Sequence, residues 1–484
     1  MPHDPETTLD SDKLHSHDAW RNPESSQGTQ VPLLGADVSA VETRISRPIH
    51  YLGSKLRVVD SIRRSIDTVS QEHSPVCDLF AGSGTVSVAL SPTRDVTAVD
   101  IQEYSRVLCS AVLEPADISG DDVDDALRKA RGESLFGRLA WAFAPLIEHE
   151  RRCIELARSG DNEPLCDLME HGCVLGLQSG NPAPSDLELC RSLRSTIERL
   201  EQEGLASGPE SVVSRYYGGV YFSYHQAVQL DSVASTAFDA AKGKRDCLIA
   251  AVLSSASDVV NTVGKQFAQP IRPRDAGGTP KRHLLSHIER DRWLDVFSSF
   301  ESWLRRYASL PRSGRKHRAV RSDYRDFLKS EPKDVGVFYA DPPYTRDHYS
   351  RYYHLLETLC LRDVPSVSSV RIGGRTLMSR GVYRSQRHQS PFCIKTQAPG
   401  AFSELFEGVR RLNAPLVLSY SPYDKAGRAR PRLMAVGDVV LQARRIFRRV
   451  EVISAGRIAH NKLNASTHNT AVSYDAEVLI ICEP

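Results

Sequence analysis

The chain of 484 residues is 40% hydrophobic and 25% charged, which is the composition of an ordinary globular protein, and its formal net charge is +2. Its length predicts about two to three structural units. It has no run of about 18 apolar residues and no basic segment followed by an apolar one at the N-terminus, so we expect neither a membrane span nor a secretory signal.

The ten cysteines are scattered along the chain and form no CxxC pair. Such usage is typical of reduced thiols in a cytoplasmic protein rather than of a disulfide framework. A zinc site would have to draw on Cys166, His171, Cys173 and Cys190, whose spacing matches no standard zinc pattern. We therefore predict a cytoplasmic protein without a metal site.

The first segment of the chain differs from the rest in composition. Residues 1–45 are rich in Asp, Glu, Ser and His and contain few apolar side chains. Such a segment cannot bury enough apolar surface to offset the entropy of ordering, so it is predicted to be a disordered tail.

The ordered part begins with half of a doubly wound α/β fold. Helical periodicity over residues 56–69 precedes a buried strand at 75–80, a glycine turn and a helix that starts at Val86. A second strand at 95–100 then ends in Asp100. The order strand, glycine turn, helix, strand and acid is typical of a Rossmann-like fold.

The alternation of strands and helices is then interrupted. Residues from about 115 to 320 have mostly helical patterns, with breaks rich in Ser, Gly and Pro. Further buried strands are predicted at 335–340, 415–420, 449–453 and 477–482. The prediction is one α/β domain, formed by residues 46–115 and 321–484, that is interrupted by a largely helical insertion at 116–320.

The near-neutral total charge conceals two basic segments. Residues 271–325 contain 14 Lys and Arg against 6 Asp and Glu, and residues 371–432 contain 12 against 3. Each segment alone is compatible with an ordinary solvated surface. Together they favour a polyanion partner, most simply a nucleic acid.

The glycine turn at residues 78–85 (DLFAGSGT) indicates a cofactor site. A dinucleotide fingerprint has a third glycine where this chain has Ser87, and a carboxylate such as Asp78 would repel a pyrophosphate. S-adenosylmethionine carries sulfonium and ammonium groups and no phosphate, so it suits an acidic environment. Asp100 is then placed to accept both ribose hydroxyls. A tight turn that binds something else remains the alternative.

Residues 341–344 (DPPY) follow an apolar, strand-like run. The two prolines lack N–H donors and have a fixed φ, so the turn is stiff and offers acceptors. Together with the Asp341 carboxylate and the Tyr344 ring, such a turn can hold a flat, amine-bearing ring. The alternative is an ordinary Asp-Pro-Pro turn.

Taken in order, these motifs resemble a known family. Residues 51–55 (YLGSK), 78–84 (DLFAGSG) and 341–344 (DPPY) occur in this order, with a large insertion before the last. The chain resembles the DNA adenine methylase class of adenine-N6 methyltransferases, in the arrangement that places the target recognition domain between the cofactor half and the catalytic motif. Further similarity covers residues 216–222 (YYGGVYF) and 349–357 (YSRYYHLLE).

The resemblance implies a Rossmann-like, S-adenosylmethionine-dependent methyltransferase fold with the insertion at 116–320 as target recognition domain. The implied activity is site-specific methylation of the N6 amine of adenine in double-stranded DNA, with the target base flipped out of the duplex. The insertion of about 200 residues is longer than a short recognition site requires, so its length and helical character suggest contacts with partner proteins of a restriction-modification or phage-defence system.

The resemblance also assigns roles to single residues. Cofactor-binding roles fall on Tyr51, Lys55, Asp78, Gly82, Gly84, Asp100, Asp323 and Asp341. Tyr51 stands where many relatives have tryptophan, and Asp326 competes with Asp323 as the acid that reads the cofactor's adenine edge. In catalysis, the Asp341 carboxylate and the Pro342 carbonyl would accept the amine hydrogens and localise the lone pair, while Tyr344 stacks on the base.

Four aromatic residues after this motif have two interpretations: Tyr349, Tyr352, Tyr353 and His354. They either wall the substrate pocket or DNA path, or they pack between helices.

Three other functions remain open. The same chemistry on RNA or on cytosine N4 is one, although cytosine enzymes more often have Ser where this chain has Asp341. A non-catalytic DNA-binding or assembly subunit is another, but such a scaffold has no physical need for Tyr344, Gly82 and Asp100. A nicotinamide dehydrogenase is disfavoured by the glycine spacing.

Overall fold

A seven-stranded β-sheet organises the computed structural model, which describes residues 47–51, 53, 55–346, 349–421, 432–455 and 477–484. The strand order is β3-β2-β1-β4-β7-β9-β8. The strands are β1 Val76–Asp78, β2 Val96–Asp100, β3 Arg318–Arg321, β4 Val337–Ala340, β7 Leu416–Tyr420, β8 Arg449–Ser454 and β9 Val478–Glu483. The first five in this order run parallel, and β9 is antiparallel to both neighbours. The predicted tail over residues 1–45 lies outside the described residues.

All six strands expected from the sequence are present, whereas β3 was not predicted. This strand reads RAVR, lies at the sheet edge and pairs only with β2, so it lacks the apolar run that marks the buried strands. The predicted insertion extends to residue 320, but β3 begins at Arg318 and already belongs to the sheet.

Helices cover both faces of the sheet because its central strands are apolar on both sides. In β4, Val337 and Tyr339 pack in one hydrophobic cluster, and Phe338 and Ala340 pack in another on the opposite face. The helices that contribute to the first cluster are α2 Val59–Val69, α3 Thr85–Leu90 and α4 Glu103–Leu113. Those of the second are α15 Tyr324–Lys329, α18 Ala398–Arg411 and α19 Val436–Arg444.

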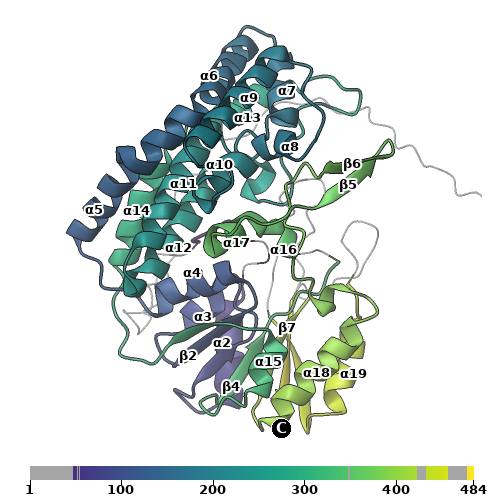
Figure 1. The fold of residues 1–484 in the computed structure, drawn as a ribbon. Coiled ribbons are helices and arrows are strands. Elements are labelled where there is room, and N and C mark those ends of the chain that lie inside the picture. The colour runs from purple at the N-terminus through teal and green to yellow at the C-terminus, as the bar shows by residue number, and fades with distance from the viewer. Residues whose placement is uncertain (1–46, 52, 54, 347–348, 422–431, 456–476) are drawn as a thin grey trace, which may run out of the picture. The chain divides into compact units, whose positions relative to one another are not determined.

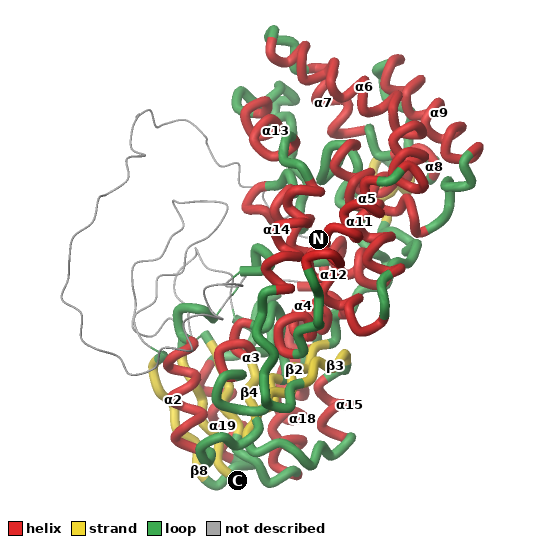
Figure 2. The backbone as a smooth tube through the Cα atoms, turned by 90° about the vertical axis from the view of Figure 1, so that its left-hand side faces the viewer, coloured by secondary structure: helices red, strands yellow, loops and turns green. Residues whose placement is uncertain are grey.

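A helical layer follows β2 in the chain, as the sequence predicts (Figures 1 and 2). Its helices are α4 Glu103–Leu113, α5 Gly120–Arg131, α6 Arg138–Arg158, α7 Glu163–His171, α8 Val174–Gln178, α9 Leu187–Gln202, α10 Val212–Tyr217, α11 Tyr224–Asp239, α12 Lys242–Val259, α13 Leu284–Arg292 and α14 Val296–Ala308. Helix α12 is buried around most of its circumference and contacts α4, α11 and α14. Through α4, which also contacts β2 and β3, the helical layer is joined to the sheet.

A second chain segment that leaves the sheet, between β4 and α18, completes the helical layer. Helices α16 Tyr349–Tyr352 and α17 His354–Leu361 precede a hairpin of β5 Ser369–Ile372 and β6 Arg375–Met378. Leu355, Leu356 and Leu359 of α17 share the hydrophobic cluster of α12. The helical layer is therefore assembled from two separate parts of the chain, and the sequence predicted only the first.

None of the helices in the described ranges combines the length and the apolar character that crossing a membrane requires.

Candidate active site

A cavity opens at the carboxyl ends of β1, β2 and β4 and encloses about 1200 Å³, part of which is open solvent. Strand order changes direction between β1 and β4, and this is where open α/β sheets place their ligands. The predicted site residues that line the cavity are Tyr51, Lys55, Asp78, Gly82, Asp100, Asp323, Asp341, Pro342 and Tyr344. The fold thus brings together side chains from segments that lie far apart in the sequence.

The glycine turn is held against the end of β2 by Asp100. The backbone N–H groups of Gly82 and Gln102 donate to the two carboxylate oxygens of Asp100, each at 2.9 Å. Burial raises the pKa of Asp100, and these two hydrogen bonds oppose the rise. Gly82 has a φ of +55°, and a Cβ at this position would lie 2.5 Å from the Tyr51 hydroxyl oxygen. Only glycine fits this turn beside Tyr51.

Gly84, to which the resemblance gives a cofactor-binding role, is not among the described residues that line the cavity. It precedes α3 with a φ of +79°, and a Cβ there would lie 3.1 Å from the Cys109 sulfur on α4. The residue shapes the turn and lets α3 approach α4 closely.

Asp78 is buried beneath the turn and is bonded internally. It accepts a hydrogen bond from the Ser87 hydroxyl at 2.8 Å and a longer one from the Phe80 N–H at 3.4 Å. Burial raises the pKa of Asp78 to about 7, although both hydrogen bonds lower it. Ser87, the position at which a dinucleotide site has glycine, therefore serves as a hydrogen-bond donor to this carboxyl group.

Asp341, the acid of the DPPY motif, belongs to a buried cluster of three charges. The Lys55 Nζ lies 3.1 Å from Asp341 Oδ1 and 3.0 Å from Glu477 Oε1, and Ser419 donates to the same glutamate oxygen at 2.6 Å. Burial raises the pKa of Asp341 to about 6; Lys55 lowers it and Glu477 raises it. Burial alone would lower the pKa of Lys55, but the two carboxylates raise it well above its usual value.

Glu477 was not predicted from the sequence as a site residue. This residue stands at the start of the last predicted strand, so a buried acid was visible there, but no local pattern linked it to Lys55 across 422 positions.

The Tyr344 ring lies between cations and a second aromatic ring. The Arg432 guanidinium is 4.8 Å and the Lys55 Nζ 5.7 Å from the ring centroid, and the Tyr420 ring is 5.1 Å away. Arg432 is held by Ser421, to whose hydroxyl it donates at 2.7 Å. Arg432 is a second neighbour of the DPPY motif that the sequence analysis did not find.

The structure distinguishes the two candidates for the adenine-reading acid. Asp323 lines the cavity and caps α15 by accepting from the Arg325 N–H at 2.9 Å. Asp326 is exposed and absent from the lining. His388, which the sequence analysis missed, also lines the cavity; burial lowers its pKa, while Asp323 and Asp100 raise it.

The aromatic residues that follow the DPPY motif divide between the two predicted roles. Tyr349 lines the cavity. Tyr353 is buried and stacks on Tyr51, with ring centroids 5.0 Å apart and an interplanar angle of 11°. His354 is buried, and burial lowers its pKa to about 3, so it is neutral. Packing between helices is therefore the role of Tyr353 and His354.

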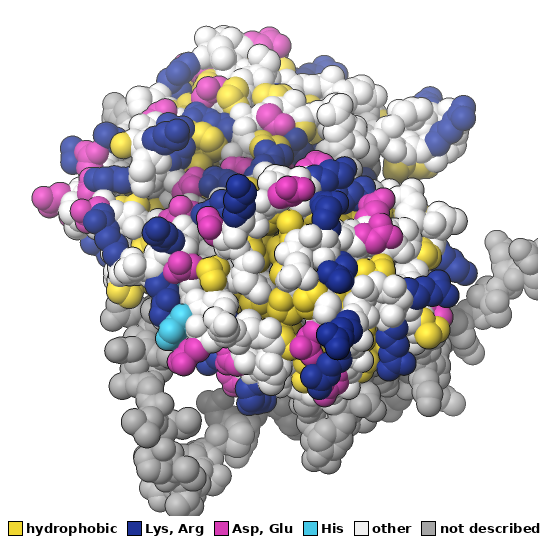
Figure 3. Space-filling model, turned by 90° about the horizontal axis from the view of Figure 1, so that it is seen from below, with side chains coloured by type: hydrophobic (Ala, Val, Ile, Leu, Met, Phe, Trp, Pro, Cys, Tyr) yellow, Lys and Arg dark blue, Asp and Glu magenta, His cyan; other side chains and the backbone are white. Residues whose placement is uncertain are grey.

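The two basic segments differ in the structure. In residues 271–325, many of the cations pair with carboxylates: Arg274, Arg290, Arg292, Arg305, Arg312, Arg321 and Arg325. In the described part of residues 371–432, only Arg384 has such a partner, Asp363 at 2.6 Å. On the face seen from below in Figure 1, Lys and Arg are interspersed with Asp and Glu (Figure 3). The first segment thus carries less uncompensated charge than its composition predicts.

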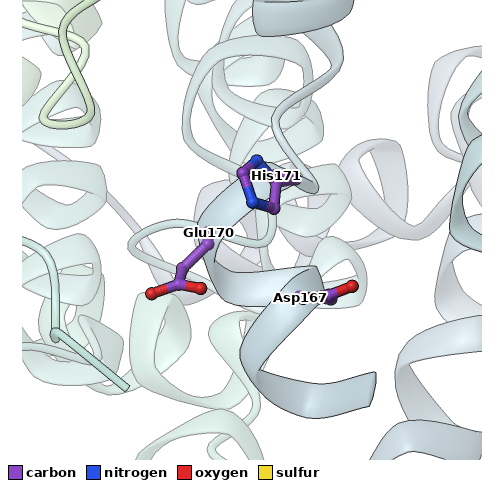
Figure 4. Close-up of side chains that lie close together, drawn as sticks. All are labelled: Asp167, Glu170 and His171. Atoms are coloured by element: carbon purple, nitrogen blue, oxygen red, sulfur yellow. The ribbon is translucent and has the colours of Figure 1, made fainter. Parts of the chain in front are cut away.

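Three side chains on α7 are of the types that bind metal ions. Asp167, Glu170 and His171 lie within one turn of this helix (Figure 4). Arg274 already pairs with both carboxylates, at 3.2 and 3.0 Å. The guanidinium supplies the cation for these acids, so we assign no metal to them. Of the four residues considered for zinc, only His171 belongs to this group.

Comparison with known proteins identifies the relatives of this site. Residues 51–136, which contain the glycine turn and Asp100, match the model of the D12 class N6 adenine-specific DNA methyltransferases. The resemblance to adenine methyltransferases is confirmed. The chain is also 25% identical over 381 residues to the modification methylase LlaI of Lactococcus lactis subsp. lactis. This match covers 77% of the chain but 46% of the relative, so the chain spans about half the length of that curated protein. The mostly parallel sheet is consistent with a methyltransferase fold.

Proposed function

We propose that the chain is a site-specific DNA methyltransferase that transfers a methyl group from S-adenosylmethionine to the N6 amine of adenine. One observation carries the proposal: Asp341 and Tyr344 of the DPPY motif line the same cavity as the glycine turn and Asp100. A methyl donor on the turn and an amine held by the motif would therefore meet in one site. The similarity to a modification methylase supports a role in a restriction-modification or phage-defence system.

The charges of the cavity suit this methyl donor. Four aspartates, Asp78, Asp100, Asp323 and Asp341, line it, and among the described lining residues Lys55 is the one Lys or Arg. A pyrophosphate would meet net repulsion here, whereas a ligand with sulfonium and ammonium charges would be attracted. S-adenosylmethionine supplies an electrophilic methyl group when bound, with Asp100 as the acceptor for ribose hydroxyls and Asp323 for the adenine edge.

Asp341 and Pro342 activate the amine. The lone pair of an adenine amine is delocalised into the ring, so the amine is a poor nucleophile. Two acceptors aimed at its hydrogens localise the lone pair: the Asp341 carboxylate and the Pro342 carbonyl. Lys55 bonds to Asp341 Oδ1 and keeps the carboxylate charged despite its burial. Most of the rate then comes from holding the amine at the correct position.

The geometry of the cavity requires the target base to leave the DNA duplex. A base in a duplex cannot reach the end of β4, so the target adenine is flipped into the cavity and stacks on Tyr344. The part of the helical layer that lies between α4 and β3 in the chain serves as the target recognition domain, and the sheet with the helices that cover it forms the catalytic domain. Protein partners of a restriction or defence complex would contact the same helical layer.

Methyl transfer to genomic DNA tests the proposal. Purified protein is incubated with labelled S-adenosylmethionine and DNA from diverse genomes, and the methylated nucleosides are identified by mass spectrometry. We expect N6-methyladenine from the wild-type protein and none from Asp341→Ala, with cofactor affinity measured by calorimetry for both. Cofactor binding without transfer to any DNA would favour the non-catalytic scaffold. Label in N4-methylcytosine or in an RNA control would refute the assignment to adenine in DNA.

A further inference from the structure

Three arginines beside the cavity carry charges that no described carboxylate neutralises. Arg351 lies on α16, Arg380 follows β6, and Arg387 lies seven positions further on; all three are half-buried. No carboxylate of the described residues is within 4.0 Å of their nitrogen atoms. Most arginines of the first basic segment do have such partners, so these three differ from that segment.

Two of the three share one aromatic ring. The guanidinium carbon of Arg351 lies 4.4 Å and that of Arg387 5.3 Å from the centroid of the Tyr383 ring. Arg351 also donates to the Tyr383 hydroxyl at 3.0 Å. Two like charges on one ring repel each other, and the ring itself offsets only about 0.5–2 kcal/mol per cation. An anion between them would remove this repulsion.

The arginines also present hydrogen-bond donors that have no acceptor. Arg351 Nε, Arg380 Nε and Arg387 Nη1 are buried and have no hydrogen-bond partner among the residues that the structure describes. Burial lowers the pKa of Arg387, and neighbouring Arg351 lowers it further. An unpaired buried donor on a charged group costs free energy, which makes an oxyanion ligand favourable at this position.

The group lies at the edge of the proposed active site. Ser350 and His388, the chain neighbours of Arg351 and Arg387, both line the cavity. Tyr349 lines it as well, and its ring lies 6.4 Å from that of Tyr352. A ligand held by the arginines would therefore lie next to whatever enters the cavity.

We infer that Arg351 and Arg387 form a binding site for phosphate groups of the DNA strand that carries the target base. The inference rests on the proposed function for its choice of DNA. Guanidinium groups offer paired N–H donors that match two oxygens of a phosphate. Arg371 and Arg375 of the exposed hairpin are also without a described carboxylate partner and extend the positive charge, as a polyanion requires.

The test measures DNA affinity as a function of salt, independently of methyl transfer. Arg351→Gln, Arg387→Gln and the double variant are titrated with a fluorescein-labelled duplex, and binding is followed by anisotropy between low and moderate salt. Each phosphate contact contributes about 0.9 to the slope of log K against log salt. We expect each single variant to reduce the slope by about one and the double variant by about two.

Matched variants separate a phosphate contact from a structural role. Arg151→Gln removes an exposed arginine of α6 that pairs with Glu148, and it should leave the slope unchanged. Arg351→Lys retains the charge and should retain most of the slope while weakening affinity. Cofactor affinity, measured by calorimetry, should be the same in all folded variants. If Arg351→Gln does not fold, Arg387→Gln and Arg351→Lys carry the test.

An unchanged salt slope in the folded variants would overturn the inference. Inorganic phosphate that binds the wild type, with a DNA slope that the variants do not alter, would identify a free-phosphate site and would also overturn it. A reduced slope in a protein that methylates no DNA would leave the phosphate site standing and refute the proposed function instead.

Discussion

Replacing Lys55 by methionine perturbs the proposed catalytic acid without touching it. The ammonium lies 3.1 Å from Asp341 Oδ1 and 3.0 Å from Glu477 Oε1, and it is largely buried. At an effective dielectric constant of about 20, a contact of this length contributes about 5 kcal/mol, which is equivalent to about four pKa units. Without Lys55, two carboxylates remain buried side by side, and one of them must protonate.

The predicted result is a shift in the pH dependence of methyl transfer. In the wild type, burial raises the pKa of Asp341 to about 6, and only the ionised form accepts the amine hydrogen. The rate should therefore fall as the pH drops through about 6. In Lys55→Met, relaxation and water would offset about half of the lost Coulomb energy. The acidic limb of the pH–rate profile should therefore move up by about two pH units. Transfer near pH 7 should fall about tenfold or more and recover at higher pH.

The assay is single-turnover transfer at saturating cofactor across the pH range, with cofactor affinity measured separately. The double variant Lys55→Met/Glu477→Gln removes the second carboxylate, so its acidic limb should return part of the way toward that of the wild type. Lys55→Arg retains the charge and serves as the matched control. An acidic limb that stays in place in Lys55→Met would refute the role of Lys55 in keeping Asp341 ionised.

Three further predictions concern the cavity. Gly82→Ala places a methyl group 2.5 Å from the Tyr51 hydroxyl oxygen at a φ of +55°, so calorimetry should show cofactor affinity reduced about tenfold or more; unchanged affinity would exclude the turn as a cofactor contact. Asp323→Ala should weaken cofactor binding by about 1–3 kcal/mol, whereas the exposed Asp326→Ala should not, and equal effects would refute the choice of Asp323. Burial raises the pKa of Asp78 to about 7, so the folded state binds its proton more tightly than the unfolded state does, and this group's contribution to stability is lost as the pH rises from about 4 to 7. Thermal unfolding of Asp78→Asn should be less sensitive to pH over that interval than unfolding of the wild type, and an identical dependence would contradict the raised pKa.

Local patterns along the chain were sufficient for much of the fold. A buried parallel strand needs an apolar run, and a turn at positive φ needs glycine, so residues 75–100 predict β1, the glycine turn, α3 and β2 without reference to the remainder. The same applies to β4 and the stiff turn after it. The residues of the DPPY motif carry their chemistry in adjacent positions, which is why the sequence suggested an amine-binding site.

The tertiary structure decided the features that depend on which segments meet. The charge state of Asp341 depends on Lys55 and Glu477, which come from opposite ends of the described chain. Strand β3 has too little apolar character to be found from its sequence and exists because β2 offers it a free edge. Helix α17 completes the helical layer because its leucines pack against residues of α12, which lies about 100 positions earlier in the chain.

Charge shows most clearly how the prediction from sequence differs from the folded structure. Composition alone ranks both basic segments as candidate nucleic-acid surfaces, because counting residues ignores their partners. In the folded chain, acids from distant helices neutralise much of the first segment, whereas in the described part of the second segment only Arg384 has a carboxylate partner. The order of elements and motifs along the chain was enough to predict the fold and the site chemistry of an adenine methyltransferase. Only the tertiary structure decided which positive charges stay uncompensated, because an ion pair forms between groups that are close in space wherever they lie in the chain.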